Sequence, residues 1–287
     1  MSRRIRDDTH KISVLRDSKS VTKHETWFSD QPPDLGPGFS AADADRRRTT
    51  VIAILRRAAK RAKRVNSEQT EALSHLVNKL QACRPRHRCG SLACPPCARS
   101  WQKAKTAAHE AIISATKKGP SKRLVFVTVI PKKKMYQPGR FSQIDIKKAN
   151  RWLKDVLKPI GNRTIVGSAD LGWETRRGKG YIQVHWHLVM WTKSRKTLKK
   201  KLGVIFKRTK KHERPVKVQV VRDHGVLAYI NKVIRLPEWL RTNRTNLPEL
   251  LVLLDRTAAL IFMVHRNVKL IAQYGRLLFK RIGQNEQ

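Results

Sequence analysis

Runs of apolar, β-branched and aromatic residues mark the middle of the chain as a region of β-strands. Residues 181–191 form an apolar run rich in β-branched and aromatic side chains, and residues 165–174 form a second such run. The segment between them, residues 175–180, contains two glycines, which suit a tight turn. The two runs therefore predict an antiparallel hairpin, and shorter runs at residues 124–130 and 216–221 predict two more strands.

Apolar residues at helical spacing predict helices on either side of these strands. The expected helices cover residues 41–80 in two parts, 101–116, 144–157, 196–206, 226–234 and 247–264, with a shorter apolar run at 269–279. From the first strand onward the order is strand, helix, strand, strand, helix, strand, helix. That order predicts an α+β fold, in which helices pack on one side of an antiparallel sheet.

Changes in composition divide the chain into four expected segments. Residues 1–40 are polar and interrupted by prolines and glycines, which predicts a largely disordered basic arm. Residues 41–120 are expected to be helical and contain all four cysteines, and residues 121–236 contain the expected sheet. Residues 237–287 are expected to be a helical segment that packs back on the sheet domain, with a dimer contact as the alternative.

The charge of the chain narrows the class of partner. The sequence contains 63 lysines and arginines against 21 acidic residues, a formal net charge of +42. Nucleic acid is the expected partner, because a compact cationic body is favoured beside a polyanion and each neutralised phosphate releases counterions. A ribosomal protein could be as basic, so charge alone indicates no chemistry. The sequence shows no apolar signal segment and no convincing membrane span, so a cytoplasmic protein without a membrane partner is expected.

Two histidines on the second run of the hairpin are candidate metal ligands. Successive side chains of a strand point to opposite faces, so His185 and His187 share one face. A turn centred on residues 177–178 would pair Asp170 with His185, and a longer turn would pair it with His187; either register places the carboxylate on the histidine face. This 2-His-1-carboxylate group suits Mn²⁺ or Mg²⁺, with Zn, Fe or Co as alternatives. Glu174 has the same parity and is the second candidate for the carboxylate, whereas two histidines without a metal are the simpler alternative.

Four cysteines within fifteen residues predict a second metal site. They are Cys83, Cys89, Cys94 and Cys97. The last two have the spacing of a zinc knuckle, and four thiolates complete a closed tetrahedral site whose role is structural. His87 is the alternative ligand if Cys83 or Cys89 is left out. Reduced thiols on a metal also fit a cytoplasmic protein.

Three features in a fixed order resemble the HUH endonucleases, the superfamily of rolling-circle replication initiators and relaxases. His185-Trp186-His187 resembles their His-hydrophobic-His motif, and Tyr229, followed by Lys232 on the same helical face, resembles their tyrosine helix. A strand like residues 126–130 precedes the histidines in that family. The cysteine cluster resembles the one in a plasmid-initiator branch, and the resemblance covers the chain from about Cys83 to the end, loosely after Lys232.

The resemblance implies a metal-dependent tyrosine nuclease that starts rolling-circle replication of a plasmid. Tyr229 would attack a DNA phosphodiester and leave a 5′-phosphotyrosine and a free 3′-hydroxyl. The ion on Asp170, His185 and His187 would polarise the phosphate, and Lys232 would supply positive charge. Single-stranded origin DNA would be the substrate, and a host replication helicase and polymerase are candidate partners.

One departure from the family concerns termination. Some initiators carry an acidic residue one turn before the tyrosine, where this chain has Gly225, with Asp223 and His224 nearby. The sequence shows no GxxxxGK[ST] motif of a fused helicase, which favours a small plasmid-type initiator. A relaxase or transposase of the same superfamily is the sibling alternative. A non-catalytic zinc-bearing nucleic-acid-binding protein is the alternative from another class, and it leaves the aligned histidines and carboxylate unexplained.

Overall fold

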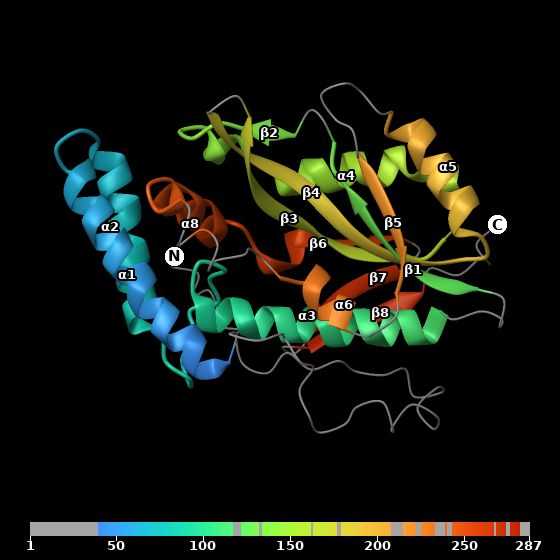
Figure 1. Ribbon diagram of the computed structural model, residues 1–287. Coiled ribbons are helices and arrows are strands. Elements are labelled where there is room, and N and C mark those ends of the chain that lie inside the picture. The colour runs from blue at the N-terminus through green and yellow to red at the C-terminus, as the bar shows by residue number, and fades with distance from the viewer. Residues whose placement is uncertain are drawn as a thin grey trace, which may run out of the picture.

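A computed structural model describes residues 40–116, 122–131, 134–161, 163–176, 179–207, 215–221, 225–232, 239, 243–266, 268–273 and 276–281. Figure 1 shows a central sheet with helices packed against it and a pair of helices at one side. The expected basic arm lies outside the described residues, apart from Ser40. Within the described part of the chain, no helix is both long enough and apolar enough to cross a membrane.

Six strands form one antiparallel sheet. Five of them follow the order β5-β1-β4-β3-β6, and the short β2 pairs with β4 off this path. The strands are β1 (Arg123–Val129), β2 (Met135–Tyr136), β3 (Ile165–Arg176), β4 (Lys179–Thr192), β5 (Val216–Val220) and β6 (Met263–Arg266). The strand with both candidate histidines, β4, is the middle one of the five, so its side chains are enclosed by neighbours on either side.

Seven α-helices are described, and their bounds agree with most of the sequence predictions to within a few residues. They are α1 (Ala41–Ala62), α2 (Ser67–Ala82), α3 (Pro95–Thr116), α4 (Ile146–Val156), α5 (Arg195–Ile205), α6 (Gly225–Ile230) and α8 (Leu247–Arg256). Short 3-10 turns lie at Phe141–Gln143, Lys158–Ile160 and Ala259–Phe262. The fold is therefore α+β, as the order of elements predicts.

Helices cover both faces of the sheet. On one face, Ile112 of α3 and Leu227 of α6 pack with Val166 and Val189 of the central strands. On the opposite face, the buried Trp186 of β4 donates a hydrogen bond of 2.7 Å to an asparagine of α4. The prediction of helices on one side only is wrong. The cause is α3, which precedes the first strand and buries polar as well as apolar side chains, so its packing face has no clear apolar stripe in the sequence.

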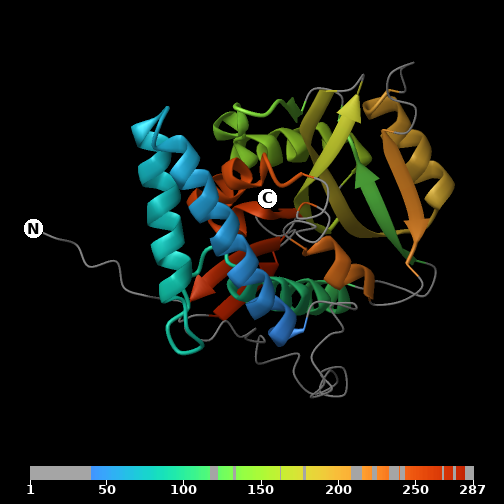
Figure 2. The same ribbon diagram turned by 60° about the vertical axis from the view of Figure 1, so that its left-hand side comes forward.

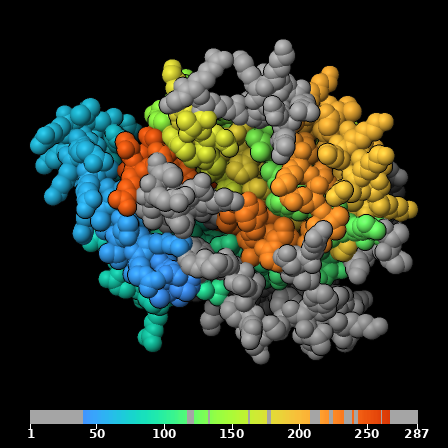
Figure 3. Space-filling model, viewed as in Figure 1, coloured from blue at the N-terminus to red at the C-terminus, as the bar shows by residue number. Residues whose placement is uncertain are grey.

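Helices α1 and α2 form an antiparallel pair beside the sheet (Figure 2), here called the helical lobe. Ser40 and Asp43 form a capping box at the start of α1, and Asn66 caps α2. Leu55 of α1 and Leu76 of α2 are among the buried residues of the main core. In the space-filling view the lobe projects from the body of the molecule, so much of its outer surface is open to solvent (Figure 3).

The C-terminal region differs from the sequence prediction. The helix expected over residues 247–264 ends at Arg256, and Met263–Arg266 is strand β6, paired with β3. Where a second helical run is expected, the chain forms a separate two-stranded sheet of β7 (Val268–Gln273) and β8 (Arg276–Arg281). The prediction is wrong because a continuous apolar run has no period that separates a buried helix from a buried strand.

Candidate active site

The β3–β4 hairpin brings Asp170, His185 and His187 together on the sheet face that α6 covers. Asp170 pairs directly with His185, which is the register of the shorter turn. Nε2 of His185 and Nε2 of His187 each lie 3.4 Å from Oδ2 of Asp170. One candidate ligand atom of each residue lies within 4.8 Å of the other two, so one metal ion can contact all three side chains.

The sheet orients both imidazole rings through their other nitrogen. His185 Nδ1 lies 3.3 Å from the carbonyl oxygen of Gln183, and His187 Nδ1 lies 3.3 Å from the hydroxyl oxygen of Thr128 on β1. A partner at Nδ1 fixes the ring and leaves Nε2 as the metal-facing nitrogen. Nε2 of His187 is buried and, among the residues that the structure describes, has no hydrogen-bond partner, so a cation would satisfy this polar atom. The three residues therefore fit a metal ion.

Close packing fixes the two rings further. Phe126 of β1 stacks on His187 with ring centroids 5.4 Å apart. His185 lies over Gly172 of β3, where an added Cβ atom would come within 2.9 Å of the ring carbon Cε1. Gly172 thus leaves space that the His185 ring occupies. Sequence reasoning missed this role, because a glycine two residues from a candidate ligand has no distinguishing pattern of its own.

The ligand side chains have the charge states that bind a divalent cation. Burial alone would raise the pKa of Asp170, but its interactions with His185, His187 and the ammonium of Lys232 outweigh burial and hold the pKa well below its usual range. Burial lowers the pKa of His187, against the opposing effect of the Asp170 carboxylate. The site therefore combines an ionised carboxylate with a neutral imidazole, and both offer lone pairs to a metal.

Tyr229 lies beside this cluster on α6, the short helix that Figure 1 shows next to α3. Its ring centroid is 5.1 Å from that of His187 and 6.0 Å from that of Phe126. The side chain is 37% exposed, so a large substrate can reach the phenol. Lys232 follows the helix, with its Nζ 3.6 Å from the centroid of the Tyr229 ring and 3.1 Å from Oδ2 of Asp170. One lysine thus contacts both the tyrosine and the carboxylate.

A buried polar network docks α6 on the sheet. Asn231 is completely buried and donates from Nδ2 to the carbonyl oxygen of Leu227, at 2.8 Å, and to the hydroxyl of Thr106 on α3, at 3.4 Å. Its Oδ1 accepts a hydrogen bond of 3.2 Å from the hydroxyl of Ser168 on β3. Gln102 of α3 donates a hydrogen bond of 2.8 Å to the carbonyl oxygen of Ala228 on α6. Because α6 is only six residues long, these contacts rather than its own hydrogen bonds set its position.

Helix α3 also contains a buried lysine, close enough to Asp170 for the two charges to interact. Lys105 is completely buried, and its Nζ has no hydrogen-bond partner within the described part of the chain. Burial lowers its pKa to about 8, against the opposing effect of the Asp170 charge. His109, one turn along, is also completely buried, and its ring centroid lies 6.2 Å from that of His265. The sequence gives no signal for these residues, because lysine and histidine in an alanine-rich helix are typical of an exposed face.

The four cysteines gather where α2 ends and α3 begins. Three pairs of sulfurs, Cys83–Cys97, Cys89–Cys97 and Cys83–Cys94, are each 3.6 Å apart. A tetrahedral site with Zn–S bonds of about 2.3 Å has sulfur–sulfur edges of about 3.8 Å, so the arrangement fits one ion. Contacts with the other three sulfurs lower the pKa of Cys83 and raise that of Cys94. Four thiolates this close need a cation, because like charges at this distance oppose ionisation.

The alternative ligands lie outside the two groups of residues that could hold a metal ion. Glu174 is exposed near the hairpin turn and is not part of the group formed by Asp170 and the histidines. His87 is exposed and is not part of the four-cysteine group. Gly225 is the first residue of α6, while Asp223 and His224 lie outside the described residues.

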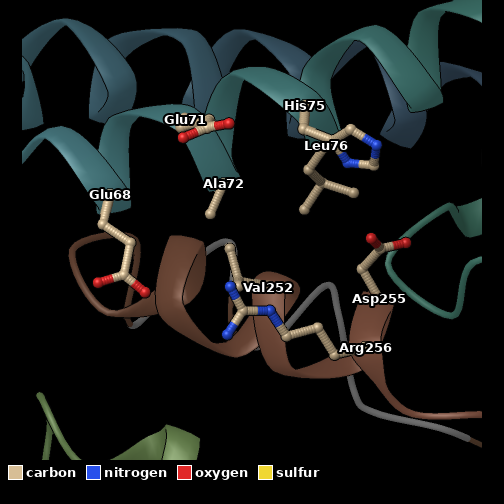
Figure 4. Close-up of a pocket in the computed structure, with 8 residues that line it drawn as sticks. All are labelled: Glu68, Glu71, Ala72, His75, Leu76, Val252, Asp255 and Arg256. Carbon is tan, nitrogen blue, oxygen red and sulfur yellow. The ribbon is translucent and has the colours of Figure 1, made fainter.

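A surface pocket lies between α2 and α8 (Figure 4). It is lined by Glu68, Glu71, Ala72, His75, Leu76, Val252, Asp255 and Arg256. Its acidic side chains do not form a metal site of the kind described above, because within the described residues the two groups of ligand atoms close enough to share an ion are the four cysteines and the Asp170 cluster.

The chain matches no protein-family model, no curated protein and no solved structure.

Proposed function

We propose that this protein nicks and rejoins single-stranded DNA through a covalent 5′-phosphotyrosine at Tyr229. The observation that carries the proposal is the convergence of three ligand side chains, a tyrosine and a lysine, from separate elements, on one face of the sheet. Packing does not require such a group, because burying a carboxylate and an ammonium costs free energy that apolar side chains would not. A site for metal-assisted phosphoryl transfer requires all of them.

Asp170, His185 and His187 would together hold one divalent ion. Mn²⁺ or Mg²⁺ suits a carboxylate with two imidazoles, and such an ion, when bound, polarises the non-bridging oxygens of a phosphodiester. The part played by the protein is to keep the carboxylate ionised and to direct Nε2 of each histidine toward its oxygen. These features hold whichever of the two metals is used.

Tyr229 is the proposed nucleophile. Its phenolic oxygen forms a bond to the scissile phosphorus, while the bond from phosphorus to the 3′ oxygen of the preceding nucleotide breaks. The phenol proton passes to solvent, which reaches this partly exposed side chain, and the departing 3′ oxygen takes up a proton to become a hydroxyl. Because one phosphodiester replaces another, the 3′-hydroxyl can attack the phosphotyrosine in the reverse step and rejoin the strand without ATP.

Lys232 is the proposed electrostatic partner of the nucleophile. Its ammonium lies against the face of the Tyr229 ring, where a positive charge stabilises the negative charge that develops on the phenolic oxygen. The same ammonium contacts Asp170, so it also lies beside the position where a phosphate would meet the metal ligands. Tyr229 and Lys232 are therefore proposed as the catalytic pair.

This chemistry is that of the HUH superfamily, which the His-Trp-His motif and the tyrosine–lysine pair resemble. The proposed biological role is initiation of rolling-circle replication of a plasmid, since a nick that leaves a free 3′-hydroxyl can prime strand displacement by a host polymerase and helicase. The four-cysteine group is proposed to hold structural Zn²⁺. A relaxase or transposase would use the same site in the same way.

Formation of a covalent protein–DNA adduct tests the proposal. The full chain is incubated with Mn²⁺ and single-stranded oligonucleotides of randomised sequence labelled at their 3′ ends, and adducts are separated on a denaturing gel. Tyr229→Phe should abolish the adduct. Tyr181 lies on the β3–β4 hairpin that carries the metal ligands but outside the site, so Tyr181→Phe should leave the adduct unchanged. His185→Ala should abolish the adduct with nearly unchanged DNA affinity, because affinity rests on many phosphate contacts. An adduct that persists in Tyr229→Phe would contradict the assignment of the nucleophile.

A non-catalytic zinc-bearing nucleic-acid-binding protein is the second candidate. The net charge of +42 and the four-cysteine group favour it. It predicts DNA binding with no adduct under any divalent metal, and it gives no reason for Lys232 to contact both Tyr229 and Asp170. The adduct assay therefore separates the two functions.

A further inference from the structure

We propose that the outer face of α1 binds duplex DNA at a surface separate from the nicking site. This surface consists of Arg57, Lys60 and Arg61 of α1 and of Arg64 in the turn that follows the helix, and is named here the α1 cationic stripe. All four residues are exposed. Helical spacing places the first three on one side of α1, opposite the buried stripe that includes Leu55 and faces the lobe interior.

The α1 cationic stripe lacks the ion pairs that two arginines near the start of the same helix have. Near the start of α1, Arg46 pairs with Asp43 and Arg48 pairs with Asp45. Within the described residues, no carboxylate lies within ion-pair distance of the stripe. Like charges three and four residues apart destabilise a helix, and the helix dipole compensates this only for Lys60 and Arg61, which lie in the last turn. The dipole leaves the mutual repulsion within the row in place, so the row favours a polyanion outside the chain.

The start of the second helix of the lobe carries two carboxylates. Glu68 and Glu71 of α2 line the pocket against α8, together with Asp255 (Figure 4). Because α1 and α2 lie side by side (Figure 2), the lobe has the cationic stripe on one helix and two carboxylates near the start of the other, whose Lys79 pairs with Asp255 of α8. A charge that served solubility alone would not need this segregation. It orients the lobe, with α1 toward phosphates and α2 away from them.

The composition of the α1 cationic stripe favours a duplex over a single strand. Three of its four residues are arginines, whose planar guanidinium groups bind phosphate oxygens in pairs. The sequence of α1 contains no aromatic residue, whereas surfaces that bind single strands stack bases on aromatic rings. A row of cations fixed on a helix over about 6 Å, from Arg57 to Arg61, fits the regularly spaced phosphates of a duplex. Duplex DNA is therefore the partner to which we assign the stripe.

Two triple variants with the same loss of charge test this assignment. Arg57→Gln/Lys60→Gln/Arg61→Gln alters the stripe, and Lys196→Gln/Lys199→Gln/Lys200→Gln alters exposed lysines of α5, at the other end of the molecule (Figure 1). Binding of a short duplex DNA of arbitrary sequence is followed by fluorescence anisotropy over a range of KCl concentrations, without added divalent metal. All substituted residues are exposed, so the fold of each variant should match that of the parent by circular dichroism.

The stripe variant should bind duplex DNA on the order of 100-fold more weakly at low salt, and the slope of log affinity against log salt should fall by about 2–3. The α5 variant should lose only a few-fold, because its three cations are lysines, which bind phosphate as point charges without the paired hydrogen bonds of arginine. Equal losses in both variants, or no loss in the stripe variant, would overturn the proposal. So would a loss confined to duplex RNA or to phosphatidylserine vesicles, measured in parallel. No strand is cut in this assay, so its failure leaves the nicking proposal standing, and a failed adduct assay leaves the stripe standing.

Discussion

The hydroxyl of Ser168 donates a hydrogen bond of 3.2 Å to Oδ1 of Asn231, and this bond joins the strand of Asp170 to the helix of Tyr229. Ser168 pairs with His187 in the sheet and precedes Asp170 by two residues, so all three share a face. Asn231 also bonds to the tyrosine helix and to α3. One buried amide thus sets the distance between the proposed nucleophile and the proposed metal ligands.

Replacing this amide should slow catalysis without removing the metal. Asn231→Ala should reduce the rate of adduct formation about 10- to 100-fold, because small displacements of a reacting group have effects of this size. Its Mn²⁺ affinity, measured by calorimetry, should stay unchanged. Asn150→Ala is the matched control, since Asn150 makes comparable buried hydrogen bonds on the opposite face of the sheet. Both variants should lose about 1–3 kcal/mol of unfolding free energy, and an equal slowing in both would contradict a positioning role.

Filling the space under His185 should weaken metal binding. In Gly172→Ala the new Cβ would come within 2.9 Å of the ring, while the backbone there has no positive φ that would exclude alanine. The ring must shift, so Mn²⁺ affinity should fall about 10-fold, the size of effect seen when the orienting shell of a ligand is disturbed. Gly203→Ala on α5 meets nothing within 4 Å and should leave the affinity unchanged while stabilising the fold by about 0.5–1 kcal/mol. Unchanged affinity in Gly172→Ala would show that the space is not needed.

Removing the buried charge of Lys105 should stabilise the protein. Burial lowers the pKa of Lys105 to about 8 from 10.5. Between these values the unfolded chain binds the proton and the folded chain does not, so the penalty is complete below about pH 8 and the stability rises as pH increases toward 10.5. Lys105→Met should therefore raise the unfolding free energy by on the order of 3 kcal/mol at neutral pH and by much less at pH 10.

Urea unfolding at several pH values, without added Mn²⁺, measures this difference. Lys103→Met on the same helix is unsuitable as a control because Lys103 is partly buried. Lys200 on α5 is exposed, so Lys200→Met should show no pH-dependent gain. A Lys105→Met variant that is less stable than the parent at neutral pH would mean that the ammonium is compensated in the folded chain.

Removing one sulfur should release the ion proposed for the cysteine group. Metal analysis of the parent chain should find about one zinc per chain, and Cys94→Ser should lose most of it. Because Cys83 follows α2 and Cys97 lies in α3, loss of the ion should also loosen the helical lobe and lower its thermal transition. His87→Ala is the control and should keep its zinc, since His87 lies outside the cysteine group. If His87→Ala lost as much zinc as Cys94→Ser, His87 would have to be a zinc ligand in the parent protein.

The metal-ligand cluster could be predicted because it depends on one short-range rule. A period of two places His185 and His187 on one face, and the hairpin turn brings Asp170 to the same face in either register. Four cysteines in a short segment are equally local. These groups assemble within single supersecondary units, so the sequence pattern contains most of the information that the structure adds.

The support around the cluster could not be predicted, because it depends on packing between distant segments. Strand pairing and helix docking bring three supporting residues to the site, namely Thr128, Phe126 and Asn231. No spacing pattern in the sequence predicts those contacts. Lys105 looks like an exposed residue until α3 is known to lie against the sheet. The strand Met263–Arg266 was predicted as helix because its apolar neighbours conceal the change of period.

That last strand has a consequence for biosynthesis. Met263–Arg266 pairs along residues 165–168 of β3, so nearly a hundred residues must leave the ribosome after β3 before its outer edge is covered. Until then the outer edge of β3 exposes unpaired main-chain groups, and apolar side chains that are buried in the folded protein are open to other chains. Such an edge is the usual starting point for intermolecular strand pairing. Nascent chains stalled before residue 263 would therefore be the form of this protein most in need of chaperones.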